Sequence, residues 1–303
     1  MDKTLVLVPN DKMYFFPYVK HQNITIQSVC RELSSFEMQL MRGIRRLDLP
    51  YPMFFGNWKK SLSEYKNVII FDMCFTPSLV KYIIAHSDAK VYVYLWNPIK
   101  NNKKMLGYVM KTQKFAKIFS YDKDDCEKYH MSFAPMMYSS DLKKNSASIT
   151  ADLAFLGYAK DRVPQLQQYF KEFTEVGLKC NFYVVGSHCD CDSVDGFTVS
   201  QRGLSYQEYL KMIESSNAIL DLVQGGQSGL SLRVLESVFL EKKLVTGNVR
   251  VKEYDLYRPE NIFILENHNI EQIKDFFAEP YVPIEKDILK KYDFANWVKQ
   301  YFV

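Results

Sequence analysis

The segment from Asn217 to Asn248, NAILDLVQGGQSGLSLRVLESVFLEKKLVTGN, constrains the fold more than any other part of the chain. It predicts a buried strand at 218–223, a glycine-rich loop at 224–229, a helix at about 230–240 and a second strand at 243–246. Strands that are apolar almost throughout are typical of a parallel sheet covered on both faces. The glycines let the backbone approach a ligand closely, and the helix N-terminus that follows them favours an anion.

Two charged residues of this helix, Arg233 and Glu236, are three positions apart and therefore share one helix face. A cation beside an anion site and a carboxylate for sugar hydroxyls together suit a nucleoside diphosphate-sugar. The alternative is that they form a solvated ion pair, worth less than about 1 kcal/mol, at an ordinary strand–turn–helix joint.

The stretch SGLSLRVLESVFLEKKLVT resembles the donor-site segment of GT-B glycosyltransferases. The longer segment from Leu220 to Leu265, together with FSYDKDDCEKYHMSFAPMMYS, is similar to bacterial lipopolysaccharide and capsule biosynthesis transferases of this fold. The resemblance implies an α/β GT-B fold, in which two Rossmann-like domains with parallel sheets face a cleft. It also implies that Glu236 contacts the ribose. Retaining members commonly carry another glutamate near this loop, but Ser228 occupies that position, so the sequence leaves retention or inversion open.

The 303 residues suit two domains, and a polar stretch, SSDLKKNSASIT, separates them near residues 139–150. We expect an acceptor-binding domain at 1–142, a nucleotide-sugar donor domain at 143–283, and a C-terminal helix at 284–303 that packs back on the first domain. Residues 1–150 carry 22 Lys and Arg against 13 Asp and Glu, a balance of +9, while the whole chain carries only +4. The first half is therefore expected to meet an anionic partner.

The resemblance assigns further donor contacts in the second domain. A glycine and basic residues follow its first strand, where the family places the donor phosphates. The loop after its third strand lies near the nucleotide base in the family. The expected nucleotide-sugar-binding residues are Gly157, Lys160, Arg162, Arg202, Gly203, Gly226, Gln227, Ser228, Gly229, Leu230, Arg233 and Glu236.

The first domain offers a candidate base and a candidate membrane contact. Asp72 follows a predicted strand at 67–71, at the carboxyl edge where ligands of such sheets bind, although a capping or turn role is the alternative. A helix is predicted over 24–47. The segment 42–60 combines Arg42, Arg45 and Arg46 with Phe54, Phe55 and Trp58, so it either rests on an anionic membrane or tucks its aromatic side chains into a local core.

No cofactor and no metal are expected. No G-x-G-x-x-G follows the first strand, and Cys189 and Cys191 lack a second pair of metal ligands. Asp122 and Asp124 lie in an acidic stretch expected to be a turn, without the glycine and glutamate of a calcium loop. Charge stabilisation on the leaving diphosphate is therefore assigned to Arg233, with Asp72 as the catalytic base of an inverting reaction.

These inferences predict a hexosyltransferase-type, metal-independent glycosyltransferase. It moves a sugar from a nucleotide diphosphate-sugar to a glycan, in particular a lipid-linked glycan, during bacterial surface polysaccharide assembly. A GT-B epimerase, a phosphoglycosyl transferase and a non-catalytic scaffold subunit are the alternatives. No apolar run reaches the length of a membrane span. We expect a cytoplasmic protein, peripheral at the inner face of the membrane, with no nucleic-acid partner.

Overall fold

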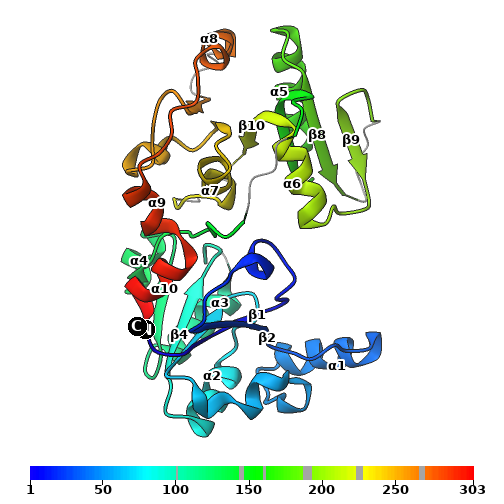
Figure 1. The fold of residues 1–303 in the computed structure, drawn as a ribbon. Coiled ribbons are helices and arrows are strands. Elements are labelled where there is room, and N and C mark those ends of the chain that lie inside the picture. The colour runs from blue at the N-terminus through cyan, green and yellow to red at the C-terminus, as the bar shows by residue number, and fades with distance from the viewer. Residues whose placement is uncertain (100–101, 143–146, 160–161, 187–192, 223–227, 266–269) are drawn as a thin grey trace. The chain divides into compact units, whose positions relative to one another are not determined.

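The structure is a computed structural model, which describes residues 1–99, 102–142, 147–159, 162–186, 193–222, 228–265 and 270–303 (Figure 1). The chain divides into two compact units. The first comprises Met1–Asp141, Gly226–Leu230 and Tyr292–Val303, and the second comprises Leu142–Gly225 and Ser231–Lys291. Each unit is an α/β assembly with its own sheet and its own core.

The first unit contains a six-stranded parallel sheet in the order β2-β1-β3-β4-β5-β6. Its strands are β1 (Thr4–Val8), β2 (Ile24–Ser28), β3 (Asn67–Phe71), β4 (Lys90–Leu95), β5 (Lys117–Ser120) and β6 (Ser132–Phe133). Its helices are α1 (Ser35–Arg46), α2 (Pro77–His86), α3 (Lys103–Thr112), α4 (Lys123–Tyr129) and α10 (Phe294–Phe302), with short 3-10 turns at Phe16–Tyr18, Pro52–Phe54, Asn57–Lys60 and Leu62–Glu64.

Both faces of this sheet are covered, which explains why its strands are apolar throughout. Leu5, Ile70 and Val93 point into a core shared with α2 and α3. On the other face α10 packs its aromatic side chains: Trp297 lies 4.7 Å from Tyr94 between ring centroids. The indole Nε1 of this fully buried tryptophan also donates to the carbonyl of Pro135 at 2.8 Å, so α10 is part of the first unit's core.

The second unit contains another six-stranded parallel sheet, in the order β12-β11-β10-β7-β8-β9. Its strands are β7 (Ala151–Tyr158), β8 (Cys180–Val185), β9 (Phe197–Ser200), β10 (Ser216–Asp221), β11 (Lys243–Thr246) and β12 (Ile262–Ile264). Its helices are α5 (Val163–Glu175), α6 (Tyr206–Glu214), α7 (Leu232–Phe239), α8 (Ile273–Ala278) and α9 (Lys286–Tyr292), with 3-10 turns at Val249–Glu253 and Ile270–Gln272.

The predicted helix over 24–47 is wrong in its first half. Residues 24–28 form β2, because the β-branched run Ile-Thr-Ile pairs in parallel register with β1. The helix begins only after Ser34, whose side chain accepts from the backbone of Glu37 while Glu37 caps the Ser34 N–H in return. The acidic stretch expected to be a turn is also helical, as α4, with Asp122 at its N-cap.

The aromatic side chains of segment 42–60 are tucked into a local core, which is the second of the two interpretations of this segment. Phe54, Phe55 and Trp58 are 4%, 3% and 0% exposed, and the Trp58 indole donates to the carbonyl of Val29 at 2.8 Å. Phe55 stacks edge-on against Tyr51 at 4.9 Å between centroids. These rings belong to a local core, and membrane insertion through them is incompatible with the structure.

Candidate functional site

The second sheet reverses its winding between β7 and β10. The chain adds β8 and β9 on one side of β7 and then returns to place β10, β11 and β12 on the other side. In open α/β sheets, ligands bind at the carboxyl ends of the two strands that flank such a switch. Here α5 follows β7 and α7 follows β10, so two helix N-termini open at this edge.

Arg233 lies in the first turn of α7 and reaches this edge. Its Nη2 donates to the carbonyl of Leu156 in β7 at 2.5 Å, and Nη1 lies 3.9 Å from the carboxylate of Asp221 at the end of β10. The guanidinium carbon stands 5.5 Å from the centre of the Phe155 ring. The side chain is 23% exposed, so one cation bridges the ends of the two switch-point strands while keeping access to solvent.

Arg162 brings a second guanidinium to the same place. Nη1 donates to the carbonyl of Leu222 at 2.8 Å and Nη2 to that of Tyr158 at 3.0 Å, so it too joins the two strand ends. It stands 5.9 Å from the centre of the Phe155 ring. Gly157 leaves room for these groups, because a Cβ would come within 2.8 Å of the Phe155 ring and 3.2 Å of Arg233 Nη2.

Three buried polar atoms at this edge have no hydrogen-bond partner among the described residues: Asp221 Oδ1, Ser231 Oγ and Arg233 Nε. Ser231 is the N-cap of α7, yet its side chain accepts no bond from the first turn of the helix. Buried donors and acceptors are nearly always satisfied in folded proteins, so these three atoms mark a place where a polar partner beyond the described residues, from the chain or from a ligand, is expected.

Glu236 lies one turn further along α7 and is 2% exposed. Its Oε1 accepts from the hydroxyl of Tyr206 at 2.9 Å and its Oε2 from that of Tyr209 at 2.5 Å, both on α6. Burial raises the pKa of Glu236, and the bonds from the two hydroxyls oppose that rise. The alternative of a solvated ion pair with Arg233 does not describe this residue, because the carboxylate is buried between two helices.

Arg202 and Gly203 lie apart from the arginine pair, in the exposed connection between β9 and α6. The Arg202 guanidinium pairs with Glu208 in the first turn of α6, and the Arg202 carbonyl accepts from the Tyr183 hydroxyl at 3.0 Å. A Cβ on Gly203 would meet nothing within 4 Å. Both residues are exposed and available to a ligand.

Ser228, Gly229 and Leu230 are buried and belong with the first unit. The backbone N–H groups of Ser228 and Gly229 donate to Asp122 Oδ2 at 2.8 and 3.3 Å, and Gly229 lies so close to Tyr121 that a Cβ would approach its carbonyl to 2.6 Å. These two N–H groups, expected to face donor phosphates, are hydrogen-bonded to a carboxylate instead. Lys160, Gly226 and Gln227 lie outside the described residues.

Asp72 follows β3 at the switch point of the first sheet, between β1 and β3. Its Oδ2 accepts from the backbone N–H of Asn97 at 2.9 Å and from the Asn97 side-chain amide at 3.0 Å. Its Oδ1 has no partner among the described residues, and the side chain is 4% exposed. Burial raises the pKa of Asp72 to about 6, partly offset by the bonds from Asn97.

Several residues of this region are not predicted as site residues from the sequence. Asp221, Ser231, Tyr206 and Tyr209 surround the two arginines and Glu236, and Asp122 holds the loop before α7. The position of Asp221 at the end of an apolar strand was a usable signal, since carboxyl ends of strands carry the polar groups. The tyrosines were not recognisable, because a period of three on one helix face is equally typical of packing.

The raised pKa of Asp72 predicts how stability depends on pH. The unfolded carboxyl titrates near 3.8 and the folded one near 6, so the folded state holds the proton more tightly. Proton binding to Asp72 therefore stabilises the folded state fully below about pH 4. This contribution to the free energy of unfolding, about 3 kcal/mol at most, is lost as pH rises through 6. Urea unfolding from pH 4 to 7 should show this loss in the native chain and not in Asp72→Asn. Parallel curves for the two proteins would contradict it.

Within the described residues, no three His, Cys, Asp or Glu side chains gather as a metal site would require. The same part of the chain contains no helix of the length and apolar character that a bilayer crossing demands. The candidate site consists of arginine and serine side chains and helix N-termini at the ends of β7 and β10.

No protein-family model and no curated protein matches the chain. Solved structures resemble it over nearly the whole length. An α-glucosyltransferase in complex with UDP and a 13-mer DNA is 10% identical, with a TM-score of 0.61 over 98% of this chain and 97% of that one. The UDP-GlcNAc 2-epimerase of Neisseria meningitidis, bound to UDP-GlcNAc, is 11% identical, with a TM-score of 0.51 over 98% and 96%.

At these identities the likeness concerns the fold alone, and it agrees with the architecture derived above. Two parallel sheets of six strands, each with its helices, make an α/β protein of the GT-B fold.

Proposed function

We propose that the chain is a glycosyltransferase that takes its sugar from a nucleoside diphosphate-sugar. The observation that carries the proposal is the pair Arg162 and Arg233, held at the switch point of the second sheet beside the N-terminus of α7. Two guanidinium groups, a helix N-terminus and a Ser231 hydroxyl with no hydrogen-bond partner among the described residues form a set of donors for a diphosphate. The two solved structures described above share the fold, and they hold UDP and UDP-GlcNAc respectively.

In this mechanism the nucleoside diphosphate leaves as charge grows on its β-phosphate. Arg233 is already oriented by the Leu156 carbonyl and Asp221, so it need not reorganise when that charge appears. Arg162 is oriented in the same way by two further carbonyls. We further propose that Glu236 contacts the ribose. Each Glu236 oxygen accepts one bond from a tyrosine hydroxyl and has a second lone pair for a ribose hydroxyl. The remaining proposed donor contacts are Gly157, Lys160, Arg202, Gly203, Gly226, Gln227, Ser228, Gly229 and Leu230.

For the acceptor we propose a glycan, in particular a lipid-linked glycan of bacterial surface polysaccharide assembly. The residues resembling transferases of that class support this assignment, and the basic balance of the first half supports an anionic or membrane-borne acceptor. The protein would then work in the cytoplasm at the inner face of the membrane, with the first unit binding the acceptor. An epimerase is the second candidate, because one neighbour of the same fold is a UDP-GlcNAc 2-epimerase. Chromatography of the sugar product, transferred or inverted at C2, separates the two.

Replacing Arg233 by Ala should lower turnover by about 100- to 1,000-fold and weaken donor binding much less, because the charge it faces grows in the transition state. Calorimetry with uridine, guanosine, thymidine and cytidine diphosphates first identifies the ligand, and initial rates with its sugar then give kcat and KM. Arg233→Lys keeps the charge and tests the need for two donors. Lys171→Ala, on the exposed surface of α5, is the control for loss of one charge.

Equal losses in binding and turnover would assign Arg233 to ground-state phosphate alone, and no loss in either would end the donor-site assignment. Glu236→Ala belongs in the same series. Loss of charge-assisted bonds to ribose should weaken nucleotide binding by about 1–3 kcal/mol. Unchanged affinity in a folded variant would leave Glu236 with only its bonds to α6.

Asp72 is our candidate for the catalytic base. A carboxylate whose pKa lies at about 6 is a stronger base than an ordinary aspartate and is still ionised at neutral pH. If Asp72 accepts the proton of the acceptor hydroxyl, Asp72→Asn should lower turnover at least about 100-fold with donor affinity unchanged. The native rate should also fall as pH drops below 6. A variant with native turnover would show that the carboxylate serves only to hold Asn97.

The proposed reaction uses no metal ion. The arginine pair supplies the positive charge that a divalent ion would otherwise bring to the diphosphate, and no acidic cluster accompanies it among the described residues. Initial rates should therefore be the same, within error, before and after dialysis against EDTA. Activity that disappears with the chelator and returns with magnesium or manganese would overturn the metal-free mechanism.

A further inference from the structure

One face of α1 is apolar and open to solvent. Phe36, Leu40 and Leu47 are spaced four and seven residues apart, so they follow one line along the helix, and they are 75%, 49% and 71% exposed. Gly43 lies on the same line, and a Cβ built there would meet nothing within 4 Å. Leu49 and Met53, in the segment that follows, are 49% and 58% exposed. The core-facing side of the helix is a different one, marked by Met41.

Beside this apolar row lies a basic recess of about 170 Å³. Its lining consists of Arg42, Arg45 and Arg46 from α1, Thr76 at the start of α2, and Lys104 and Tyr108 from α3. With about 100° between successive residues, Arg42 and Arg46 lie roughly a third of a turn around α1 from the apolar row. The row and the recess therefore occupy neighbouring sides of one helix.

The charge of the recess is not neutralised within the part of the protein that the structure describes. None of its four cations forms an ion pair with a described carboxylate. Arg45 donates to the carbonyl of Met73 at 3.2 Å, and its buried Nε has no described hydrogen-bond partner. Four cations around one hollow repel one another unless an anion joins them. The volume suits a single phosphate group and is smaller than the pockets that enclose nucleotide-sized ligands.

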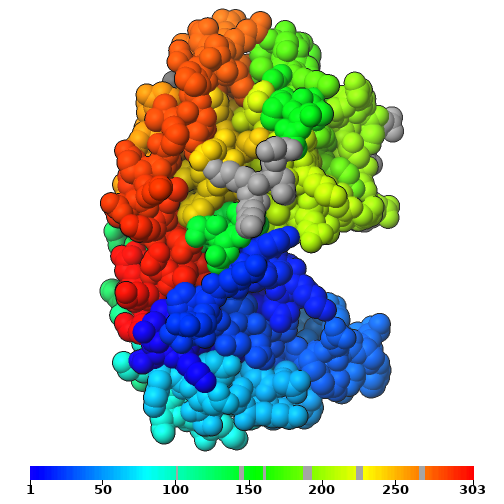
Figure 2. Space-filling view, in the orientation of Figure 1, coloured from blue at the N-terminus to red at the C-terminus, as the bar shows by residue number. Residues whose placement is uncertain are grey.

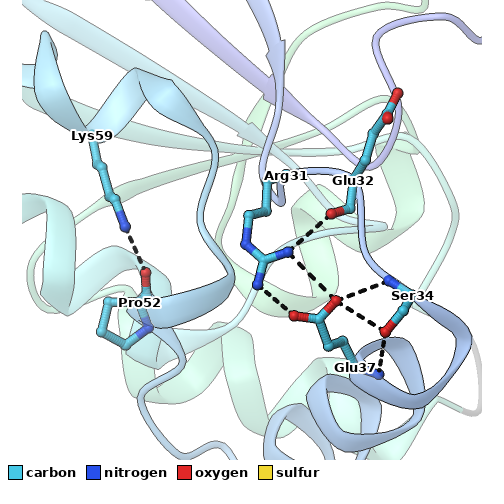
Figure 3. Close-up of polar contacts among 6 residues, drawn as sticks. All are labelled: Arg31, Glu32, Ser34, Glu37, Pro52 and Lys59. Carbon is cyan, nitrogen blue, oxygen red and sulfur yellow. Dashed lines mark hydrogen bonds and ion pairs between the residues drawn. The ribbon is translucent and has the colours of Figure 1, made fainter.

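The helix that carries these groups is fixed at its start (Figure 3). Ser34 and Glu37 form a capping box, and the guanidinium of Arg31 pairs with the Glu37 carboxylate at 2.5 Å. In the neighbouring segment, Lys59 donates to the carbonyl of Pro52 at 3.1 Å. Figures 1 and 2 show α1 at the margin of the first unit. The apolar row is thus presented by a preformed helix.

We propose that α1 and the basic recess form a docking surface for an anionic lipid bilayer, in which the recess holds a lipid phosphate and the apolar row enters the headgroup region. An amphipathic helix with cations flanking an apolar face is the usual form of such contacts. A nucleic-acid backbone would satisfy the cations and leave five large apolar side chains in water, so the apolar row favours lipid. The inference rests on the proposed function only in one respect, that a membrane-borne acceptor gives a reason for the contact. The surface itself is argued from residues of the first unit alone.

Co-sedimentation of the full chain with vesicles tests the proposal. Vesicles of phosphatidylcholine with phosphatidylglycerol should bind the protein, and vesicles of phosphatidylcholine alone should bind it far less. Replacing Arg42 and Arg46 together by Ala should lower the partition coefficient about 30-fold, because each cation near an anionic surface contributes about a factor of five. The matched control is Lys66→Ala with Lys90→Ala, which removes the same charge at the amino ends of β3 and β4, outside the recess, and should change binding much less.

A separate variant tests the apolar row. The triple variant Phe36→Ser, Leu40→Ser and Leu47→Ser should lose the part of binding that survives high salt, while circular dichroism shows an intact fold. If the Arg42/Arg46 and Lys66/Lys90 double variants lost vesicle binding equally, the attraction would depend on net charge alone. That result would overturn the docking surface. Stronger binding to glycerol phosphate or to an oligonucleotide than to anionic vesicles would also overturn it. Nucleoside diphosphate affinity measured on the same variants should stay native, so failure here is distinguishable from failure of the proposed donor site.

Discussion

Coverage of both faces of each parallel sheet is the constraint on which the rest of the structure depends. Strands such as β3 and β10 bury nearly every side chain, so polar and charged groups reach a ligand only where strands end. At the carboxyl ends of β7 and β10 the carbonyls of Leu156, Tyr158 and Leu222 accept from two arginines. The same geometry that closes the core therefore gathers cations at the switch point.

The periodic part of this architecture could be predicted from the sequence. The strands at Asn67–Phe71 and Lys243–Thr246 have the expected bounds, because polar turns on either side define where each apolar run begins and ends. Residues 24–28 could not be assigned in this way. Their apolar positions fit a helix that continues to residue 47, and only pairing with β1, a contact distant in sequence, makes them a strand.

The candidate site was predictable in its charged residues and not in their partners. Arg233 and Glu236 share a helix face, but the structure directs them to different neighbours: Arg233 toward β7 and β10, and Glu236 between two tyrosines of α6. Spacing along a helix fixes direction only to within a turn, and the packing of α6 decides which side chain is buried. Likewise, Asp122 binds the N–H groups of Ser228 and Gly229 although it is distant in sequence.

The distribution of charge shows why net balance is a poor guide to anion sites. The second half of the chain is acidic overall, yet it holds the arginine pair, because carbonyl oxygens hold both guanidinium groups and the carboxylate of Asp221 lies 3.9 Å from Arg233. An anion there meets two oriented cations at low reorganisation cost. In the first unit the cations of the α1 recess form no ion pair with a described carboxylate, whereas Arg31 on the same segment is neutralised by Glu37. What distinguishes a binding cation from a structural one is therefore its partner, which only the fold supplies.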